Sequence, residues 1–66
     1  MKIRYNGTET ALPDGLVLAD FLQQNGYRPE IIAVELNYSI IPKDSYASTV
    51  LKEGDELEVV SFMGGG

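Results

Sequence analysis

The first twelve residues carry the pattern of a β-hairpin. Residues 1–5 alternate apolar and charged side chains, which is typical of a strand with one face buried and one face in water. Asn6-Gly7 follows at once and suits the positive φ angles of a type I′ turn. Residues 8–12 are then predicted to form the returning strand. We expect two antiparallel strands, with Lys2 and Arg4 on the outer face.

The periodicity then changes to that of a helix. Leu18, Phe21 and Leu22 are spaced i, i+3 and i+4, which places them on one apolar stripe. Gly26 follows the last periodic residue and is expected to end the helix in the left-handed conformation. No Ser or Thr stands at a convincing capping position, and Asp14 is the only nearby acceptor for the helix start.

The second half of the chain predicts three more strands, over residues 31–36, 39–41 and 57–63. Pro42 cannot donate a ladder hydrogen bond, so the strand before it is short or at an edge. The intervening polar segment suits a one-turn helix or a loop, with Tyr46 as a core anchor. The order of elements indicates an α+β fold, a mixed sheet of four to five strands packed by one main helix.

Size and composition limit the chemistry. A chain of 66 residues is one domain, which we expect to span residues 1–63, followed by a glycine-only tail at 64–66. The sequence has no Cys and no His, which removes disulfides, thiolate metal sites and the commonest general base. A formal charge of −5, with five scattered basic residues, argues against nucleic acid and anionic membranes as partners. We expect a cytoplasmic protein that is monomeric when free.

Gly64-Gly65-Gly66 ends the sequence and allows two interpretations. A Gly-only end can be a frayed tail, because termini are often disordered. It can also be threaded through a narrow channel into a partner's active site, because glycine has no side chain. The α-carboxylate of Gly66, ionised at neutral pH, would then be the reactive group that is delivered.

The second half of the chain resembles a known family. The segment IIPK at residues 40–43, Tyr46 and the run EGDELEVVSFMGGG at residues 53–66 closely resemble ThiS, the sulfur-carrier family of thiamine biosynthesis. The resemblance covers essentially the whole chain in length and element order, and its most specific part is the ending. Lys43 and Tyr46 depart from the Arg and Trp common in the family. Together with the element order, the resemblance implies a ubiquitin-like β-grasp.

The resemblance also implies a role. An E1-like adenylyltransferase of the ThiF type would activate Gly66 with ATP and magnesium, and a sulfur-delivery enzyme would supply the sulfur. The resulting thiocarboxylate would donate sulfur to thiazole synthase (ThiG type). The chain itself would bind no cofactor or metal and would be a co-substrate of its partners rather than an enzyme.

Other functions stay open at this point. The small subunit of molybdopterin synthase uses the same terminal thiocarboxylate, although its chains are usually longer. A protein-conjugating modifier would also use an activated Gly66. A β-grasp interaction module with an inert tail belongs to a different class.

Strand alternation predicts a partner interface beside the tail. Val60 and Phe62 should face outward on the last strand, leading into Met63, and Ile40 should border them. Apolar side chains on an open sheet face are typical of a binding patch. The alternative is that residues 43–51 cover them. Parallel pairing of the first and last strands should also place Glu58 beside Lys2 or Arg4.

Overall fold

The chain begins with the expected hairpin. The computed structural model describes residues 1–62. Strands β1 (Lys2–Tyr5) and β2 (Thr8–Ala11) pair antiparallel, with Tyr5 opposite Thr8. Asn6 and Gly7 form the turn with φ angles of 47° and 84°, values that fit a type I′ hairpin.

Helix α1 (Leu18–Gln24) follows, with Leu18, Phe21 and Leu22 buried as the periodicity predicts. Gly26 has a φ of 76° and its N–H donates to the carbonyl of Gln23 at 3.1 Å. The next N–H, of Tyr27, returns to the carbonyl of Leu22 at 3.0 Å. These two bonds make a Schellman motif, which is why the helix ends here.

The start of α1 differs from the prediction. Asp14 does not cap the helix, and its carboxylate instead lies 2.9 Å from the amino group of Met1. No side chain caps α1, and the N–H of Leu18 donates to the carbonyl of Thr49 at 2.7 Å. A segment distant in sequence therefore satisfies a helix terminus that local sequence leaves uncapped.

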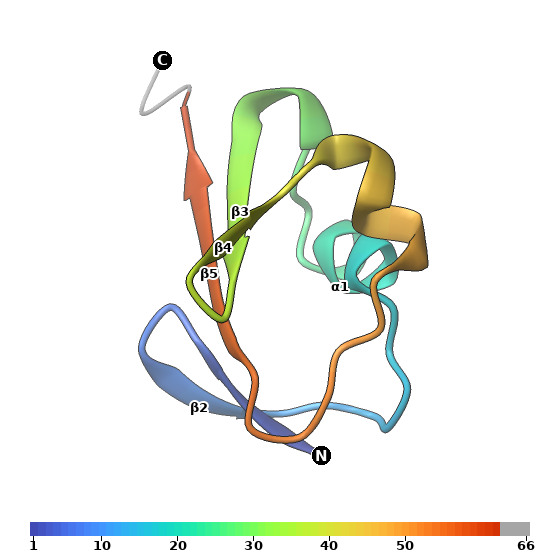
Figure 1. Cartoon of the computed structure of the whole chain (residues 1–66), viewed down its shortest axis with the longest axis vertical. Coiled ribbons are helices and arrows are strands. Elements are labelled where there is room, and N and C mark those ends of the chain that lie inside the picture. The colour runs from blue at the N-terminus through green and yellow to red at the C-terminus, as the bar shows by residue number, and fades with distance from the viewer. Residues whose placement is uncertain (63–66) are drawn as a thin grey trace.

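Five strands form one mixed sheet in the order β2-β1-β5-β3-β4 (Figure 1). The parallel pair of β1 and β5 lies inside the sheet, and β3 pairs antiparallel with both β5 and β4. This topology is the ubiquitin-like β-grasp, as the element order and the family resemblance together predict. The remaining elements are the 3-10 helices η1 (Pro29–Ile31) and η2 (Lys43–Ser48) and the strands β3 (Ile32–Leu36), β4 (Ser39–Ile41) and β5 (Glu56–Ser61).

One hydrophobic core lies between the sheet and the helices. Helices α1 and η2 lie on the same side of the sheet, and the opposite side carries no helix among the described residues (Figure 1). Tyr46 of η2 is buried, as expected of an anchor. The buried apolar residues are Ile3, Leu18, Phe21, Leu22, Ile32, Val34, Tyr46, Leu51, Leu57 and Val59.

Asp55, in the acidic turn that precedes β5, is a buried charged residue. Asp55 is only 8% exposed to solvent. One carboxylate oxygen accepts from Asn37 Nδ2 at 3.0 Å, and the other accepts from the N–H of Lys52 at 2.8 Å. Asp55 therefore joins the β3–β4 turn to the start of β5.

Candidate functional site

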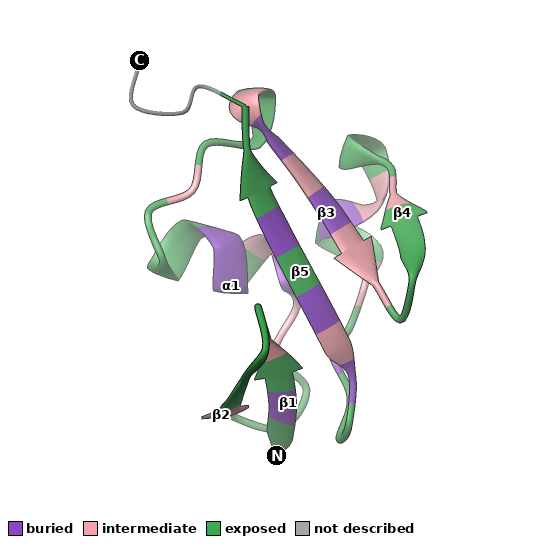
Figure 2. Ribbon diagram, turned by 90° about the vertical axis from the view of Figure 1, so that its left-hand side faces the viewer, coloured by how far each residue is buried: buried purple, intermediate pink, exposed green. Residues whose placement is uncertain are grey.

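The open face of the sheet is the candidate site. Figure 2 looks onto this face, with α1 behind it, and buried and exposed residues alternate along β5. Leu57 and Val59 point into the core, whereas Glu58 and Val60 are exposed on the outer face. This alternation follows from the two-residue period of a strand.

Three large apolar residues are exposed at or beside this face. Val60 is 57% exposed, Phe62 is 68% exposed and Ile40 is 67% exposed. The prediction that they face outward is confirmed, and the alternative that residues 43–51 cover them is wrong. The reason is that η2 packs against α1 on the other side of the sheet (Figure 1).

Charged and apolar side chains form successive rows across the open face, with the charged residues towards one end. Residues directly opposite one another on paired strands lie on the same face. The register places Arg4 opposite both Glu9 and Glu56, near one end of the face. The next outward-facing row contains Glu58, Glu35 and Ile40, and the row after it contains Val60 and Ala33.

This register corrects the expected position of Glu58. Parallel pairing of β1 and β5 brings Glu56 opposite Arg4, so Glu58 lies beyond the paired part of β1. Its partner across the sheet is Glu35 of β3. The alternation along β5 predicted the correct face for Glu58. The register between β1 and β5 could not be predicted from either strand alone, because the two are more than fifty residues apart in sequence.

The end of β5 is secured from two sides. The side chain of Asn6 accepts from the N–H of Val59 at 2.8 Å and donates to its carbonyl at 3.3 Å. On the other side, the N–H of Phe62 donates to the carbonyl of Ile31 at 2.7 Å. The strand that leads towards the tail is thereby held in place up to its last described residue. Met63, Gly64, Gly65 and Gly66, which the sequence singles out, lie outside the described residues.

A shallow hollow of about 180 Å³ lies in the middle of the open face. It combines aliphatic side chains with two carboxylates. Sequence reasoning missed Glu35, although alternation along β3 already places it on the same face as Ala33. The hollow is lined by Ala33, Val34, Glu35, Ile40, Glu58 and Val60.

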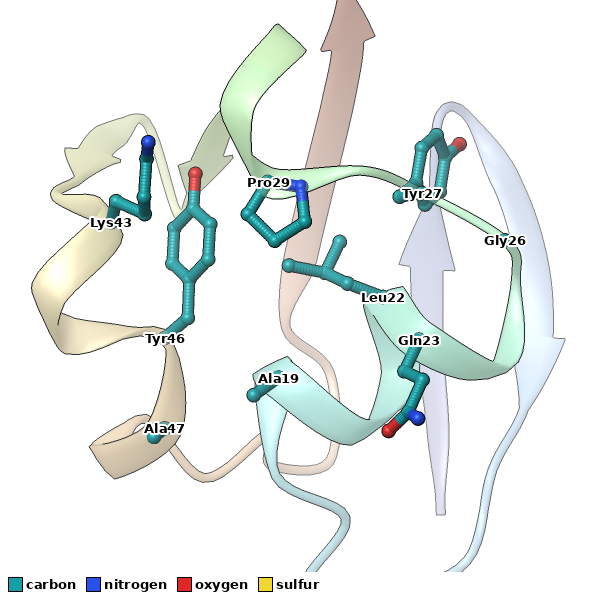
Figure 3. Close-up of a pocket in the computed structure, with 9 residues that line it drawn as sticks. All are labelled: Ala19, Leu22, Gln23, Gly26, Tyr27, Pro29, Lys43, Tyr46 and Ala47. Carbon is teal, nitrogen blue, oxygen red and sulfur yellow. The ribbon is translucent and has the colours of Figure 1, made fainter.

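A larger cavity of about 540 Å³ lies on the helix side of the sheet (Figure 3). Leu22 and Ala19 of α1 face Tyr46 and Ala47 of η2 across it, and Pro29 lies between them. Burial raises the pKa of the Tyr46 phenol. Lys43 is the one charged residue among those that line the cavity. The cavity is a gap between α1 and η2, on the face remote from Val60 and Ile40.

A second tyrosine has a perturbed acidity. The phenols of Tyr5 and Tyr27 are hydrogen-bonded to each other. Desolvation by burial, together with this bond and the neighbouring phenol, raises the pKa of Tyr5 to about 12. The ring of Tyr5 also meets Phe21 edge to face, with centroids 5.0 Å apart. Tyr5 and Tyr27 therefore pack against the core that supports the sheet.

None of the helices within residues 1–62 has the length and apolar character of a membrane-spanning helix.

Comparison with known proteins decides the family. A model of the ThiS family matches residues 3–66, which includes the final glycines. The chain belongs to the ThiS family. A crystal structure of a thiamine biosynthesis protein (ThiS) from Geobacter metallireducens has the same fold. Its TM-score is 0.84 at 29% identity, with all of both chains covered.

Two much longer proteins also match the sequence of this chain. A thiazole synthase from Magnetococcus marinus is 41% identical over all 66 residues, and one from Paramagnetospirillum magneticum is 39% identical. The chain spans only 20% of the length of each of these relatives. An uncharacterized protein, ycf40, from Porphyra purpurea is 29% identical, and the chain covers 93% of it.

Proposed function

We propose that this ThiS-family chain is a sulfur carrier for thiazole synthesis in thiamine biosynthesis. The observation that carries the proposal is the family match through residue 66, because it includes Gly64, Gly65 and Gly66. The thiamine biosynthesis protein of the same fold supports it. The same matches favour thiamine over molybdopterin synthesis as the pathway.

The chemistry takes place at the carboxylate of Gly66. One carboxylate oxygen attacks the α-phosphorus of ATP, a P–O bond to pyrophosphate breaks, and an acyl-adenylate forms. A sulfide equivalent from the sulfur-delivery enzyme then attacks the carbonyl carbon, and AMP leaves with the C–O bond pair. The product is a thiocarboxylate, which passes its sulfur to the thiazole precursor on the synthase.

The partners supply the catalytic groups in this scheme. An E1-like adenylyltransferase of the ThiF type binds ATP and magnesium, and this chain binds neither. The chain acts as a co-substrate in the cytoplasm. Its sequence has no cysteine, which is compatible with a reducing compartment where disulfides are rare. Thiazole synthase is the second partner, because the matched thiazole synthases contain a segment like this chain within their own length.

The open face of the sheet is the docking surface in this proposal. Val60, Phe62 and Ile40 expose apolar area beside the strand that leads to the tail. A partner that covers this area positions Gly64 and Gly65 for threading into its active site. Met63 would continue the same contact along the chain.

The test is the intact mass of the chain. After incubation with the cognate adenylyltransferase, ATP, magnesium and a sulfur source, we expect the mass to rise by one sulfur-for-oxygen exchange. A chain with one additional residue after Gly66 is the control, and it should bind the enzyme without being converted. An unchanged mass in the wild-type chain contradicts the carrier role and favours an interaction module with an inert tail. Conversion into an isopeptide-linked product would identify a protein modifier instead.

A further inference from the structure

Glu35 and Glu58 place two carboxylates side by side in the middle of the open face. They are directly opposite one another on β3 and β5. Directly opposite residues of an antiparallel pair have Cβ atoms roughly 4.5–5.5 Å apart, and like charges in this arrangement are destabilising. A sheet gains nothing for its own stability from two carboxylates at this position.

The described residues do not neutralise this pair. Within residues 1–62 the ion pairs are Met1 with Asp14 and Lys2 with Glu9, and neither includes Glu35 or Glu58. Arg4 is opposite Glu9 and Glu56, and its guanidinium donates to the carbonyl of Gly7 at 3.4 Å. The nearest row of basic residues is therefore already engaged with other groups.

The surroundings of the pair suit a long basic side chain. Val60 and Ile40, both more than half exposed, line the same hollow of about 180 Å³ as the two carboxylates. A basic side chain can lay its aliphatic stem along apolar surface while its charged head reaches an acidic group. Arginine suits the site better than lysine, because its planar fork of five N–H donors can serve two carboxylates and is more weakly hydrated.

We propose that the hollow receives one arginine side chain of thiazole synthase when the synthase docks on the open face. This inference rests on the proposed function and adds the chemistry by which the partner is recognised. The synthase is the chosen occupant because matched synthases hold a segment like this chain in the same polypeptide, where the two surfaces stay at high local concentration. Arginine is also among the residues enriched at interface hot spots.

The experiment measures binding of the unmodified full chain to the cognate thiazole synthase by calorimetry. Variants Glu35→Gln and Glu58→Gln each remove one carboxylate at nearly constant shape. We expect each to raise Kd by roughly tenfold, the scale of a lost hydrogen bond to a charged group. Glu9→Gln is the matched control, because Glu9 is exposed on the same face outside the hollow. It should change Kd by less than about threefold.

Thermal melting of the free variants separates binding from folding. Glu35→Gln and Glu58→Gln relieve the like-charge contact, so their Tm should equal or exceed that of the wild-type chain. Weaker binding together with an undiminished Tm supports a recognition role. Weaker binding with a lowered Tm would mean that the carboxylates serve the fold, and it would overturn the proposal.

Chemical modification of the synthase identifies the cation. Blocking the arginines of the synthase with a dicarbonyl reagent should weaken its binding to the wild-type chain. The same modification should cause no further loss of affinity for the Glu35→Gln/Glu58→Gln double variant. If both chains lose the same factor, or if only acetylation of lysines has an effect, the arginine assignment is wrong. A double variant that binds like Glu9→Gln also overturns it. None of these outcomes depends on sulfur transfer, so failure of the mass-shift test and failure of this inference remain distinguishable.

Discussion

The side chain of Asn6 pairs with the backbone of Val59 as a neighbouring strand would. Its Oδ1 accepts from the N–H of Val59 at 2.8 Å, and its Nδ2 donates to the carbonyl at 3.3 Å. The backbone of the same residue donates to Leu57 at 2.8 Å and turns the hairpin with a φ of 47°. Asn6 therefore extends the β1–β5 ladder beyond the point where β1 itself has turned away.

Replacing Asn6 by Gly should destabilise the protein by about 1–2 kcal/mol, because two hydrogen bonds to Val59 are lost while the turn keeps its positive φ. Hydrogen exchange at the Val59 amide should accelerate in this variant. Asn6→Asp is the control, because it keeps an acceptor for that amide and should preserve its protection better. Equal protection of Val59 in the Gly variant would show that this contact does not support β5.

Removing the Asp55 carboxylate should cost about 2 kcal/mol or more. Asp55→Ala leaves the Lys52 N–H and the Asn37 side chain without their acceptor at a site that is only 8% exposed. Chemical denaturation should show a lower midpoint with a similar slope. Asp44→Ala removes the same group from an exposed position and should change the free energy of unfolding by less than about 0.5 kcal/mol. Equal effects of the two substitutions would contradict the structural role of Asp55.

Tyr5 should make the protein sensitive to alkali. Its pKa is about 12 when folded, against an ordinary value of 10.0. Below pH 10 both states keep the proton and the contribution of Tyr5 to stability is fully present. Between these two values the unfolded chain loses its proton first, so stability falls as the pH rises and the contribution is gone above the folded pKa.

The Tyr5→Phe variant should therefore lose stability less steeply with rising pH over this range. Denaturation midpoints measured across the alkaline range give the slope. Tyr38→Phe is the control, because Tyr38 is 81% exposed and bonded to no core group in the described residues. A slope unchanged by Tyr5→Phe would be inconsistent with the raised pKa.

Phe62→Ala should weaken docking without weakening the fold. Its side chain is 68% exposed, so its truncation should leave Tm nearly unchanged. An aromatic anchor at a docking surface is worth roughly tenfold or more in Kd for the adenylyltransferase or the synthase. Tyr38→Asn removes an exposed aromatic ring at the far end of β3 and tolerates the positive φ there, so it serves as the control. Unchanged affinity in Phe62→Ala would remove the open face from the docking surface.

Short-range patterns were sufficient for the elements and for the faces of the strands. The turn at Asn6-Gly7, the buried stripe at Leu18 and Phe21 and the outward positions of Val60 and Phe62 all follow from residues a few positions apart. Turn geometry and the periods of helix and strand are local properties, so the local sequence specifies them. The resemblance of the ending to ThiS, which the family match confirms, is likewise a property of the sequence itself.

Relationships across the sheet required the tertiary structure. Arg4 lies opposite Glu56 rather than Glu58, and Glu58 lies opposite Glu35, because the register depends on the pairing of strands that are distant in sequence. Asp55 is buried at the start of β5, where its carboxylate accepts from Asn37 of the β3–β4 turn. The glycine ending and the outward apolar positions are thus readable from the chain, whereas the paired carboxylates in their apolar hollow exist only once β3, β4 and β5 lie side by side.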